Sequence, residues 1–553
     1  MKNKITGNLA LIILLGIFFV INIFSIRHLS ITTDEPCHLS YGKQILQLNS
    51  ERYIDGVMPI SALNVLPLKM GDILSSLINS KKYLSFFYSL NSARLITILF
   101  AVLLGFYVFK WTKELYGNTA AIFSLLLFTF SPNIIAHSQL VTGDLYATLM
   151  ITISTYYFWL FLNKGGWKRA VICAITLGIA QISKGTCLFL YPIFLLITLI
   201  KYYKTIKVYI KTKDKKSLLS MSNIFIKYSV LFILISIIII NIGFLFNNTL
   251  MPLREYNFRY PTFQKMKSIF PYLPAPFPKP FVDNLDWVKY NERTGDMCGN
   301  IYLLGKLQGQ TPYLTGFKNY YFIAYLFKEP ITIQIFLIIT IILYIKKRKE
   351  YNFYNNESFL VFSILFFTLY FNFFFRRQLG IRNIIIIFPF IYIWIGSIFK
   401  NWQSFKKKIK GVTIILIIYL IVSVLSYFPQ YIPYFNEFVW DRKQAYKILA
   451  DSNLDWGQGK WYEEQYLKKY PNSIIDPNNP VSGRIIVGAS NLVGVIRPHY
   501  RFQWLRVNFK PIYHIAYSYL VFDVPEESVD TLKKMYPVPN LPTGNRALKK
   551  HLN

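Results

Sequence analysis

Long apolar runs dominate the chain and are separated by short polar or basic segments. A run of roughly 17–25 apolar residues is long enough to cross the hydrocarbon core of a bilayer as an α-helix. Such runs lie near residues 8–26, 90–109, 118–136, 145–163, 169–183, 185–200, 228–246, 330–345, 358–375, 383–399 and 411–428. The pattern predicts a polytopic α-helical membrane protein with about eleven transmembrane helices. The weakest prediction is the pair 169–183 and 185–200, which only a short polar break separates.

The first apolar run resembles a signal peptide at its start but not at its end. Residues 9–24 follow Lys2 and Lys4, and no small-residue cleavage site precedes Arg27 and His28. A secretory signal peptide ends at such a site. We therefore expect a retained signal anchor, with the N-terminus in the cytoplasm.

Basic residues between the runs predict the orientation of the chain in the membrane. Lys and Arg concentrate in cytoplasmic loops. With the N-terminus inside, Lys110 and Lys113 fall on the cytoplasmic side, and so do the basic segments 164–169, 201–227, 346–349 and 400–410. The heavy use of Ile, Lys and Asn is typical of bacteria, so we expect a multi-pass protein of the bacterial inner (plasma) membrane.

This topology places three polar regions on the extracytoplasmic side. Two are loops, at residues 27–89 and 247–329, within a transmembrane body of residues 1–428. The second loop is rich in proline and aromatic residues, so we expect an irregular segment that lies over the membrane. Residues 429–553 form the third region, in which apolar runs shorten to strand length, as at 484–487 and 518–524. We expect a small extracytoplasmic α/β domain there.

Composition agrees with a membrane protein and disfavours several other classes. The chain is 53% hydrophobic and only 16% charged, which is not the composition of an ordinary soluble protein. The net charge of +34 resides in short segments between apolar runs rather than on one basic face, so we expect no nucleic-acid partner. No CxxC, HExxH, glycine-rich phosphate loop or Ser-His-Asp constellation is evident. Cys37 and Cys298 are both predicted outside, where they could form a disulfide or remain free thiols.

Two adjacent acids, Asp34 and Glu35, follow the first apolar run by about ten residues. Carboxylates so close to a membrane span are costly unless they are used, so they mark a candidate active site. The structural alternative is a helix start, because Thr33 or Asp34 followed by Pro36 also has the form of an N-cap with proline in the first turn.

Basic residues that break the positive-inside rule form a second candidate set. Arg376, Arg377 and Arg382 flank Gly380 between two predicted spans, and Lys184 lies at an outside break between two others. Arg and Lys suit phosphate, which suggests an anionic ligand such as a lipid phosphate. Pairing with lipid head groups or with nearby carboxylates is the alternative.

A series of short motifs is distributed over most of the chain. They are Thr33-Asp34-Glu35-Pro36 with His38 and Gly42; Ala93-Arg94-Leu95; Glu114-Leu115-Tyr116-Gly117; Ser131-Pro132 with Ala136-His137-Ser138; Thr142-Gly143-Asp144-Leu145; Gly178 with Ser183-Lys184; Tyr302-Leu303-Leu304-Gly305; Lys328-Glu329-Pro330; Gly380-Ile381-Arg382; and Asp451-Ser452-Asn453-Leu454-Asp455-Trp456-Gly457-Gln458. In order and spacing these motifs resemble the bacterial relatives of dolichyl-phosphate-mannose protein mannosyltransferases, within the membrane-embedded C-type (GT-C) glycosyltransferases. The run at residues 452–458 is the most specific part of the resemblance.

The resemblance implies an inverting glycosyltransferase. Such an enzyme moves a mannose-like sugar from a polyprenyl-phosphate donor to a protein, lipid or glycan acceptor at the extracytoplasmic face. Asp34 matches the first-loop acid that acts as general base, and Glu35 would orient it or raise its pKa by like charge. Lys184 and Arg382 match the family's basic positions and are the preferred ligands of the donor phosphate, with Arg377 third.

Other motif residues receive subsidiary roles from the resemblance. Asp144 matches the family's second acidic position and would bind acceptor, or a divalent metal if the enzyme uses one; an N-cap with Thr142 is the alternative. His38 lies one helical turn from Asp34 and could face the same cleft. Asp455 and Trp456 would form an acceptor surface or dock the C-terminal domain on the membrane body, unless they form only a structural turn with Trp at the interface.

One segment departs from the family pattern. Relatives commonly continue the first loop with a His-Pro-Pro-like turn, where this chain has Met58-Pro59-Ile60-Ser61. The missing His would have been a polar group near the expected acceptor path. Sugar or acceptor preference can therefore differ, and protein mannosylation does not follow directly.

Two functions from other classes compete with glycosyl transfer. A secondary transporter usually has two related halves with interrupted helices at matching positions, and no such repeat is evident. A non-catalytic partner that binds or flips lipid-linked glycans is the second alternative, and it would not need Asp34.

Overall fold

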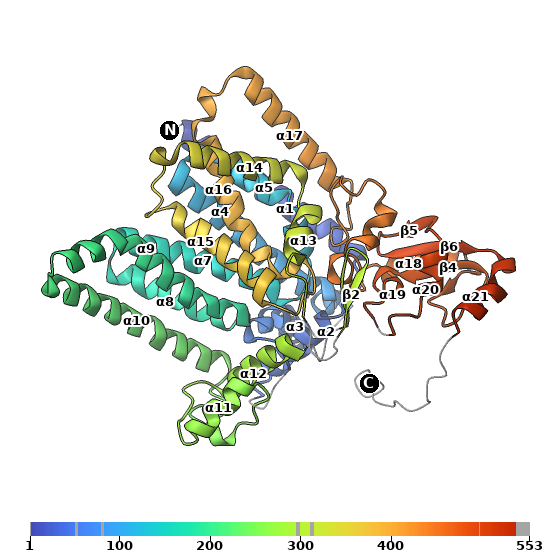
Figure 1. Cartoon of the computed structure of the whole chain (residues 1–553), viewed down its shortest axis with the longest axis horizontal. Coiled ribbons are helices and arrows are strands. Elements are labelled where there is room, and N and C mark those ends of the chain that lie inside the picture. The colour runs from blue at the N-terminus through green and yellow to red at the C-terminus, as the bar shows by residue number, and fades with distance from the viewer. Residues whose placement is uncertain are drawn as a thin grey trace.

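The structure is a computed structural model in which a large helical body carries a small sheet domain at one end (Figure 1). It describes residues 2–49, 54–78, 82–294, 299–309, 315–496 and 498–537. Cys298 lies outside these residues, so neither alternative for Cys37 and Cys298, a disulfide or two free thiols, is tested.

Eight helical segments in the described part of the chain are long and apolar enough to cross a membrane. Their principal helices are α1 (Lys2–Ser25), α4 (Leu90–Tyr116), α7 (Gly143–Lys164), α9 (Leu190–Lys211), α10 (Lys215–Gly243), α15 (Glu357–Leu369), α16 (Phe388–Gly396) and α17 (Lys407–Leu425). Two bent pairs raise the number to ten if each pair is one span. These are α5 (Asn118–Thr129) with α6 (Pro132–Ser138), bent by 63°, and α13 (Tyr320–Lys328) with α14 (Ile331–Lys346), bent by 116°.

The predicted span at 169–183 forms a helix that is shorter than the others. This is α8 (Trp167–Gln181), with 15 residues, or about 22 Å of helix. It begins just beyond the end of α7 and runs back along α7, so that Lys184 beyond its end contacts Asp144 at the start of α7. The predicted fold class, a polytopic helical body with a small C-terminal sheet domain, is confirmed.

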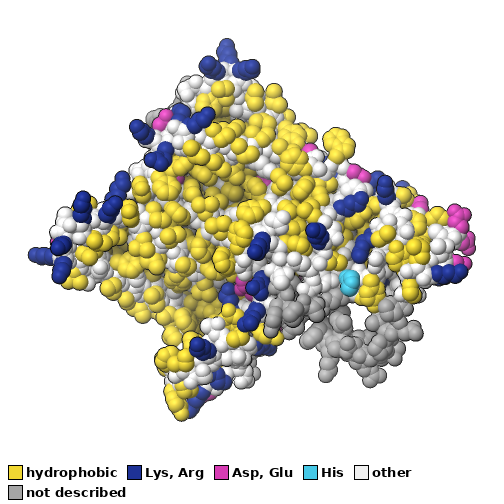
Figure 2. Space-filling view, viewed as in Figure 1, with side chains coloured by type: hydrophobic (Ala, Val, Ile, Leu, Met, Phe, Trp, Pro, Cys, Tyr) yellow, Lys and Arg dark blue, Asp and Glu magenta, His cyan; other side chains and the backbone are white. Residues whose placement is uncertain are grey.

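Basic loops and the candidate site residues lie at opposite ends of the helical body. Lys113 lies in the last turn of α4, whereas Arg94 near its start contacts Glu35. Lys164 and Asp144 are likewise at opposite ends of α7. Figure 2 shows Lys and Arg side chains at the tips of the body where α9 meets α10 and where α17 begins.

The segment at 247–329 is more regular than the sequence predicted. It contains α11 (Pro261–Ile269), α12 (Lys279–Thr294) and the short antiparallel strands β1 (Ile301–Leu303) and β2 (Lys306–Gln308) before α13. The expectation of an irregular segment is wrong because two of its prolines begin helices. Pro261 opens α11 and Pro280 is the second residue of α12, positions where proline needs no amide hydrogen bond.

The C-terminal domain is built on a four-stranded sheet in the order β3-β4-β6-β5. The strands are β3 (Ile474–Ile475), β4 (Gly483–Gly488), β5 (Tyr513–Ile515) and β6 (Tyr519–Val524), with β3 parallel to β4 and the other pairs antiparallel. Short helices α18 (Lys460–Lys469), α19 (Ala489–Leu492), α20 (Gln503–Asn508) and α21 (Val529–Met535) accompany the sheet. The strands predicted at 484–487 and 518–524 are confirmed.

Candidate active site

Asp34 lies directly before α2 (Glu35–Leu46), whose first turn contains Pro36. The sequence pattern does start a helix, but the Asp34 side chain makes no capping hydrogen bond. Its Oδ2 instead accepts a hydrogen bond of 2.6 Å from Nη1 of Arg382. The geometry therefore does not support the helix-capping explanation of Asp34.

Arg382 controls the electrostatics of Asp34. Burial alone would raise the pKa of Asp34, but the charge and hydrogen bond of Arg382 outweigh burial and lower that pKa below its ordinary value. Asp144 opposes this effect by like charge. Asp34 is therefore ionised at neutral pH, and its side chain remains 37% exposed.

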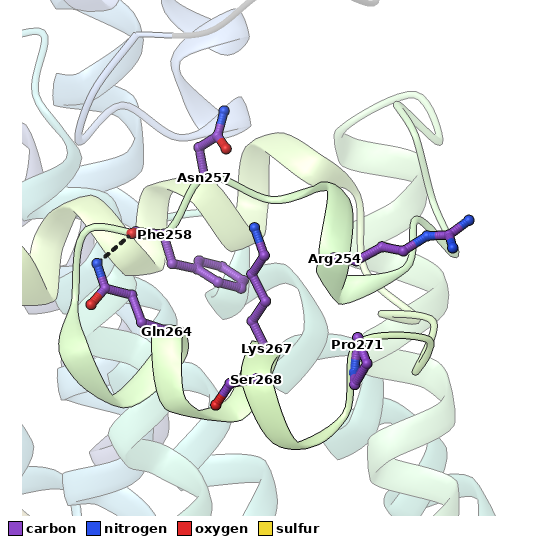
Figure 3. Close-up of a pocket in the computed structure, with 7 residues that line it drawn as sticks. All are labelled: Arg254, Asn257, Phe258, Gln264, Lys267, Ser268 and Pro271. Atoms are coloured by element: carbon purple, nitrogen blue, oxygen red, sulfur yellow. Dashed lines mark hydrogen bonds between the residues drawn. The ribbon is translucent and has the colours of Figure 1, made fainter.

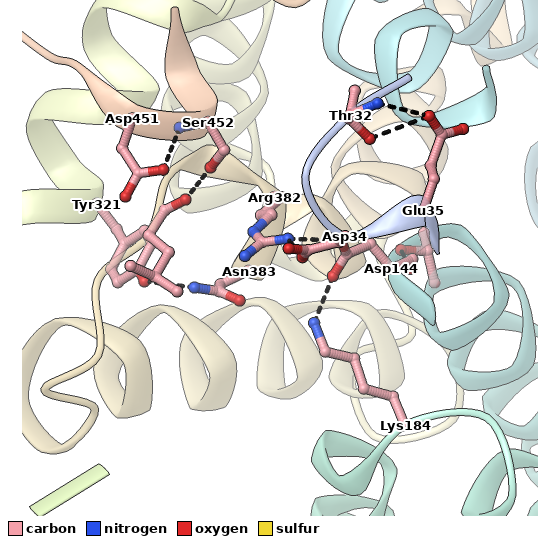
Figure 4. Close-up of polar contacts among 12 residues, drawn as sticks. Thr32, Asp34, Glu35, Asp144, Lys184, Tyr321, Arg382, Asn383, Asp451 and Ser452 are labelled. Atoms are coloured by element: carbon pink, nitrogen blue, oxygen red, sulfur yellow. Dashed lines mark hydrogen bonds and ion pairs between the residues drawn. The ribbon is translucent and has the colours of Figure 1, made fainter. Parts of the chain in front are cut away.

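Asp144 and Lys184 extend this pair into a row of four charges (Figure 4). Lys184 forms an ion pair with Oδ1 of Asp144, and Arg382 Nη1 lies 3.9 Å from Oδ2 of the same carboxylate. Asp144 is only 4% exposed, and Thr142 makes no capping bond to α7. The structure thus brings together two predicted acids and two predicted cations, with each acid facing a cation.

These four residues line one cavity of about 250 Å³. The cavity is bounded by the Asp34 loop, the start of α7, the turn after α8, and the Arg377 to Asn383 segment before α16. Its remaining wall comes from α12, which contributes Asn284, Trp287 and Glu292, and from residues 55–58. No sequence signal pointed to α12, because the segment containing it was expected to be irregular.

Arg377 differs from the other two predicted phosphate ligands. It lines the same cavity but forms no ion pair with any residue that the structure describes. Its guanidinium carbon lies 5.2 Å from the centre of the Trp287 ring, and its buried Nε has no hydrogen-bond partner among the described residues. Arg377 is thus a cavity cation without an ion pair among the described residues, although its charge acts on Asp451.

Glu35 forms an ion pair with Arg94 and does not contact the cavity charges directly. Its fully buried carboxylate accepts hydrogen bonds from Nε and Nη2 of Arg94, at 2.9 and 2.6 Å, and from the backbone of Thr32 and Val141. Arg94 also donates to the Leu29 and Ser30 carbonyls. Glu35 therefore holds the loop that carries Asp34 against α4, and the expected like-charge effect on Asp34 comes from Asp144 instead. The Ala93-Arg94-Leu95 motif was the signal for this contact.

His38 lies in the cavity wall one turn after Asp34, as the spacing predicted. Its Nδ1 is 2.8 Å from Oγ of Ser61, which belongs to the segment that departs from the family pattern. Burial lowers the pKa of His38, and the neighbouring acids only partly offset burial, so the ring is neutral at pH 7. The segment at residues 58–61, which differs from the family pattern, therefore lies close to Asp34 and Asp144. Met58 from this segment also lines the cavity.

Trp456 joins the C-terminal domain to the site. The guanidinium carbon of Arg382 lies 4.3 Å from the centre of its ring, and its carbonyl accepts a hydrogen bond of 3.3 Å from the Thr33 amide. Asp455 instead faces its own domain, where it accepts long hydrogen bonds from the amides of Gly457 and Ser490. Trp456 therefore has the geometry of a docking residue, and Asp455 contributes through its own domain.

The motif at residues 451–458 also makes hydrogen bonds to the backbone on either side of Gly380, next to Arg382. The Ile381 amide donates to Oδ1 of Asn453 at 2.9 Å, and the Ser452 hydroxyl donates to the Leu379 carbonyl. Gly380 between them has φ of +114°, and a Cβ there would clash with Oγ of Ser452. The motifs at 380–382 and 451–458 therefore contact each other directly, although some seventy residues lie between them in the chain.

Asp451 begins the motif at residues 451–458 but was not predicted as a site residue. Burial raises its pKa to about 6, although the charge of Arg382 acts in the opposite direction. Its Oδ1 accepts a hydrogen bond of 2.6 Å from the Ser452 amide (Figure 4). It is thus a third acid within the electrostatic field of Arg382.

The donor set does not fit a divalent metal. No group of three or more His, Cys, Asp or Glu side chains is placed to hold an ion within the described ranges. Asp144, the expected metal ligand, already faces Lys184 and Arg382. A metal ion would compete with both cations for this carboxylate, so no step is assigned to a metal.

The middle of the helical body has a recognisable family signature. Residues 83–213 match the family model Dolichyl-phosphate-mannose-protein mannosyltransferase. The resemblance predicted from the motifs is confirmed over this segment, which spans α4 to α9 and contains Asp144 and Lys184. No curated protein matches the chain.

Among solved structures, the chain is similar to ArnT from Cupriavidus metallidurans bound to undecaprenyl phosphate. The identity is 10%, the TM-score is 0.48, and the match covers 93% of this chain and 97% of ArnT. The oligosaccharyltransferase of Archaeoglobus fulgidus matches at 13% identity and a TM-score of 0.43, covering 82% of this chain and 60% of that protein. The complex of Archaeoglobus fulgidus AglB with an inhibitory peptide and a dolichol-phosphate matches at 12% identity and a TM-score of 0.42, covering 83% and 59%. Scores below 0.5 are too low to establish a shared arrangement.

Proposed function

We propose that this protein is an inverting glycosyltransferase that moves a mannose-like sugar from a polyprenyl-phosphate donor to a protein, lipid or glycan acceptor, with Asp34 as general base. One observation carries the proposal: a partly exposed carboxylate shares a cavity with two cations that can bind phosphate. The family matched at residues 83–213 supports the same reaction class.

The donor phosphate must enter a site whose charges are already paired. Arg382 faces Asp34 and Asp144, and Lys184 faces Asp144. A phosphate that binds Lys184 and Arg382 competes with both carboxylates, since phosphate accepts the same charge-assisted hydrogen bonds. Binding of the donor therefore withdraws Arg382 from Asp34.

This exchange prepares Asp34 for catalysis. The Arg382 charge is what lowers the pKa of Asp34, and burial acts in the opposite direction. When the phosphate takes up part of that charge, the pKa of Asp34 rises and the carboxylate becomes a stronger base. Asp144 keeps Lys184 and Arg382 oriented and acts as a positioning residue.

The reaction then needs no acid for the leaving group. The acceptor O–H gives its proton to a carboxylate oxygen of Asp34 while its oxygen attacks the anomeric carbon from the face opposite the phosphate. The bond between the anomeric carbon and the phosphate oxygen breaks, and polyprenyl phosphate leaves with its negative charge stabilised by Lys184 and Arg382. Attack from the opposite face inverts the anomeric centre.

The proposal includes the orientation in the bacterial inner membrane. The basic loops at the helix ends opposite the site favour a cytoplasmic location for those loops. The cavity and the C-terminal domain then face the extracytoplasmic side.

The test is the fate of the sugar on a labelled donor. Purified protein in nanodiscs is incubated with polyprenyl-phosphate mannose and a panel of peptide, lipid and glycan acceptors. The proposal expects a new glycoside with inverted configuration and release of polyprenyl phosphate. A partner that only binds or flips lipid-linked glycans would return the donor unchanged, and that result with every acceptor would contradict the proposal.

A further inference from the structure

A small lobe between α10 and α12 takes no part in the proposed reaction. It comprises residues 244–278, begins where the membrane span α10 ends, and contains α11. Figure 1 shows α11 beside the end of α10, at the edge of the helical body.

The lobe has its own fold. Leu253, Tyr256, Phe258 and Ala275 form a separate buried cluster, against which Phe263 of α11 packs. Backbone hydrogen bonds join its two ends, including Leu250 to Ala275 at 2.9 Å and Arg254 to Pro271 at 2.9 Å. The exposed side chains of the lobe are therefore placed by a packed core.

The outer surface of the lobe is strongly apolar. None of the residues of α11 is buried. Large hydrophobic side chains are between 37% and 74% exposed at Phe246, Leu250, Met266, Ile269, Phe270, Tyr272 and Leu273. An exposed patch of this kind on a structured segment marks an interaction surface rather than a solvated one.

The patch continues the exposed apolar surface of α10, a helix long and apolar enough to cross a membrane. Ile238 and Ile242 on α10 are 54% and 56% exposed, and Phe246 and Leu250 follow them along the chain. A bilayer crossed by α10 would place the apolar side chains of the lobe at the depth of the lipid head groups and upper acyl chains.

Cationic and polar side chains border the apolar patch. The lobe has four basic residues, Arg254, Arg259, Lys265 and Lys267, and a single acid, Glu255. Figure 2 shows dark blue side chains next to yellow ones on this part of the surface. A helix with an apolar face beside basic residues is typical of binding to an anionic membrane surface.

An open pocket of about 580 Å³ lies among these side chains (Figure 3). It is lined by Arg254, Asn257, Phe258, Gln264, Lys267, Ser268 and Pro271, none of which is acidic. Lys267 donates one hydrogen bond to the Tyr256 carbonyl at 2.7 Å, which leaves two of its three protons for another acceptor. The Arg254 guanidinium lies 4.9 Å from the centre of the exposed Tyr272 ring. The pocket thus offers two cations directly beside apolar side chains: Lys267, and Arg254, whose Nε lies 4.0 Å from Oε1 of the exposed Glu255.

We infer that this lobe is a membrane-surface anchor that binds anionic phospholipids of the outer leaflet. The head-group phosphate contacts Arg254 and Lys267, and Ile269, Phe270 and Leu273 pack on the upper acyl chains. Because α12 continues from the lobe and contributes Trp287 and Asn284 to the cavity, the anchor also fixes one wall of the active site at the membrane surface.

Photocrosslinking of the full-length protein tests the anchor. The photoreactive residue p-benzoylphenylalanine replaces Tyr272 in the lobe or, as a matched control, Met535, which is 61% exposed on α21 of the C-terminal domain. Both variants are reconstituted in nanodiscs of phosphatidylcholine with or without phosphatidylglycerol, and crosslinked lipid is identified by mass spectrometry. We expect several-fold more lipid on position 272 than on position 535, with phosphatidylglycerol enriched over its share of the bilayer.

Charge variants separate the anionic contact from simple proximity to the bilayer. The double change Arg254→Gln and Lys267→Gln should lower the enrichment of phosphatidylglycerol on position 272 by roughly fivefold per charge. The control change Lys533→Gln with Lys534→Gln on α21 should leave it unaltered. Equal crosslinking at positions 272 and 535 would overturn the anchor. Unchanged enrichment in the Arg254/Lys267 variant, with an unaltered melting temperature, would overturn the head-group contact.

Discussion

Asp34 and Arg382 are 348 positions apart in the chain, yet a hydrogen bond of 2.6 Å joins Oδ2 of the acid to Nη1 of the base. The guanidinium carbon of Arg382 also lies 4.3 Å from the centre of the Trp456 ring. The contact therefore links the first extracytoplasmic loop, the segment before α16 and the C-terminal domain. It also means that the base we propose and the phosphate ligand we propose neutralise one another until the donor arrives.

Replacement of Arg382 by Gln should shift the acidic limb of the pH–rate profile. The wild-type pKa of Asp34 is lowered, so kcat/KM should be independent of Asp34 ionisation from pH 5 upward. Without the Arg382 charge, burial raises that pKa, and the acidic limb should move up by about one pH unit or more. Arg376→Gln, an exposed residue of the same segment, is the control. An unshifted limb in Arg382→Gln would contradict the electrostatic coupling.

Loss of the Glu35 charge should destabilise the fold rather than alter the chemistry directly. Glu35→Gln leaves the fully buried Arg94 without its counter-charge, which typically costs about 3–5 kcal/mol. We expect a large fall in melting temperature in detergent. Glu350→Gln removes half of an exposed pair with Lys347 and should have little effect. If both variants melt alike, Glu35 is not the anchor of the Asp34 loop.

Lys184 should matter for donor binding. Lys184→Gln removes one phosphate ligand, and the loss of a charge-assisted hydrogen bond lowers kcat/KM for the donor by roughly 10- to 100-fold. Lys164→Gln, at the opposite end of α7, should retain wild-type kinetics. Steady-state kinetics with varied donor concentration compare kcat/KM of the two variants. A wild-type kcat/KM in Lys184→Gln would show that Lys184 does not bind the donor phosphate.

Asp455 gives a prediction about stability and pH. Burial raises its pKa in the folded protein to about 6, so the folded state binds a proton more readily than the unfolded state. Its contribution to stability is then greatest in acid and is lost as pH rises through about 6. Asp455→Asn should therefore melt at a higher temperature than wild type at pH 7.5, with the difference shrinking at pH 5. If the difference in melting temperature between Asp455→Asn and wild type were the same at pH 5 and at pH 7.5, titration of the Asp455 carboxyl would not be the cause of that difference.

The apolar periodicity was sufficient to predict most of the helical body, because a bilayer requires long uninterrupted runs. Ten of the predicted spans correspond to segments that meet the length criterion alone or as a bent pair, and the remaining one is the short helix α8. Composition also predicted β4 and β6. Helix α11 of the lobe and helix α12 of the cavity wall were not predicted. Their prolines lie in the first helical turn, but in the sequence alone such prolines look like those of a loop.

The site itself was predictable residue by residue but not as a network. Asp34, Lys184 and Arg382 stood out as charges near predicted spans, Asp144 was selected from the family resemblance, and the structure brings the four together. Which acid faces which base depends on contacts between distant segments, so Glu35 was paired with Asp34 rather than with Arg94. Trp287 carried no sequence signal for the cavity, because nothing local distinguishes it from other interfacial aromatic residues. Asp451 belonged to a quoted motif but was not predicted as a site residue.

The most direct test of the central claim is single-turnover transfer from a polyprenyl-phosphate sugar by Asp34→Asn. Asn keeps the size of the side chain and an oxygen that can accept from Arg382, but it cannot take a proton. With Asp523→Asn as an exposed control, we expect Asp34→Asn to transfer sugar at least about 100-fold more slowly than wild type. It should bind donor at least as tightly as wild type, because the phosphate then competes with one carboxylate fewer for Arg382. Transfer at the wild-type rate by Asp34→Asn would contradict the assignment of Asp34 as the general base.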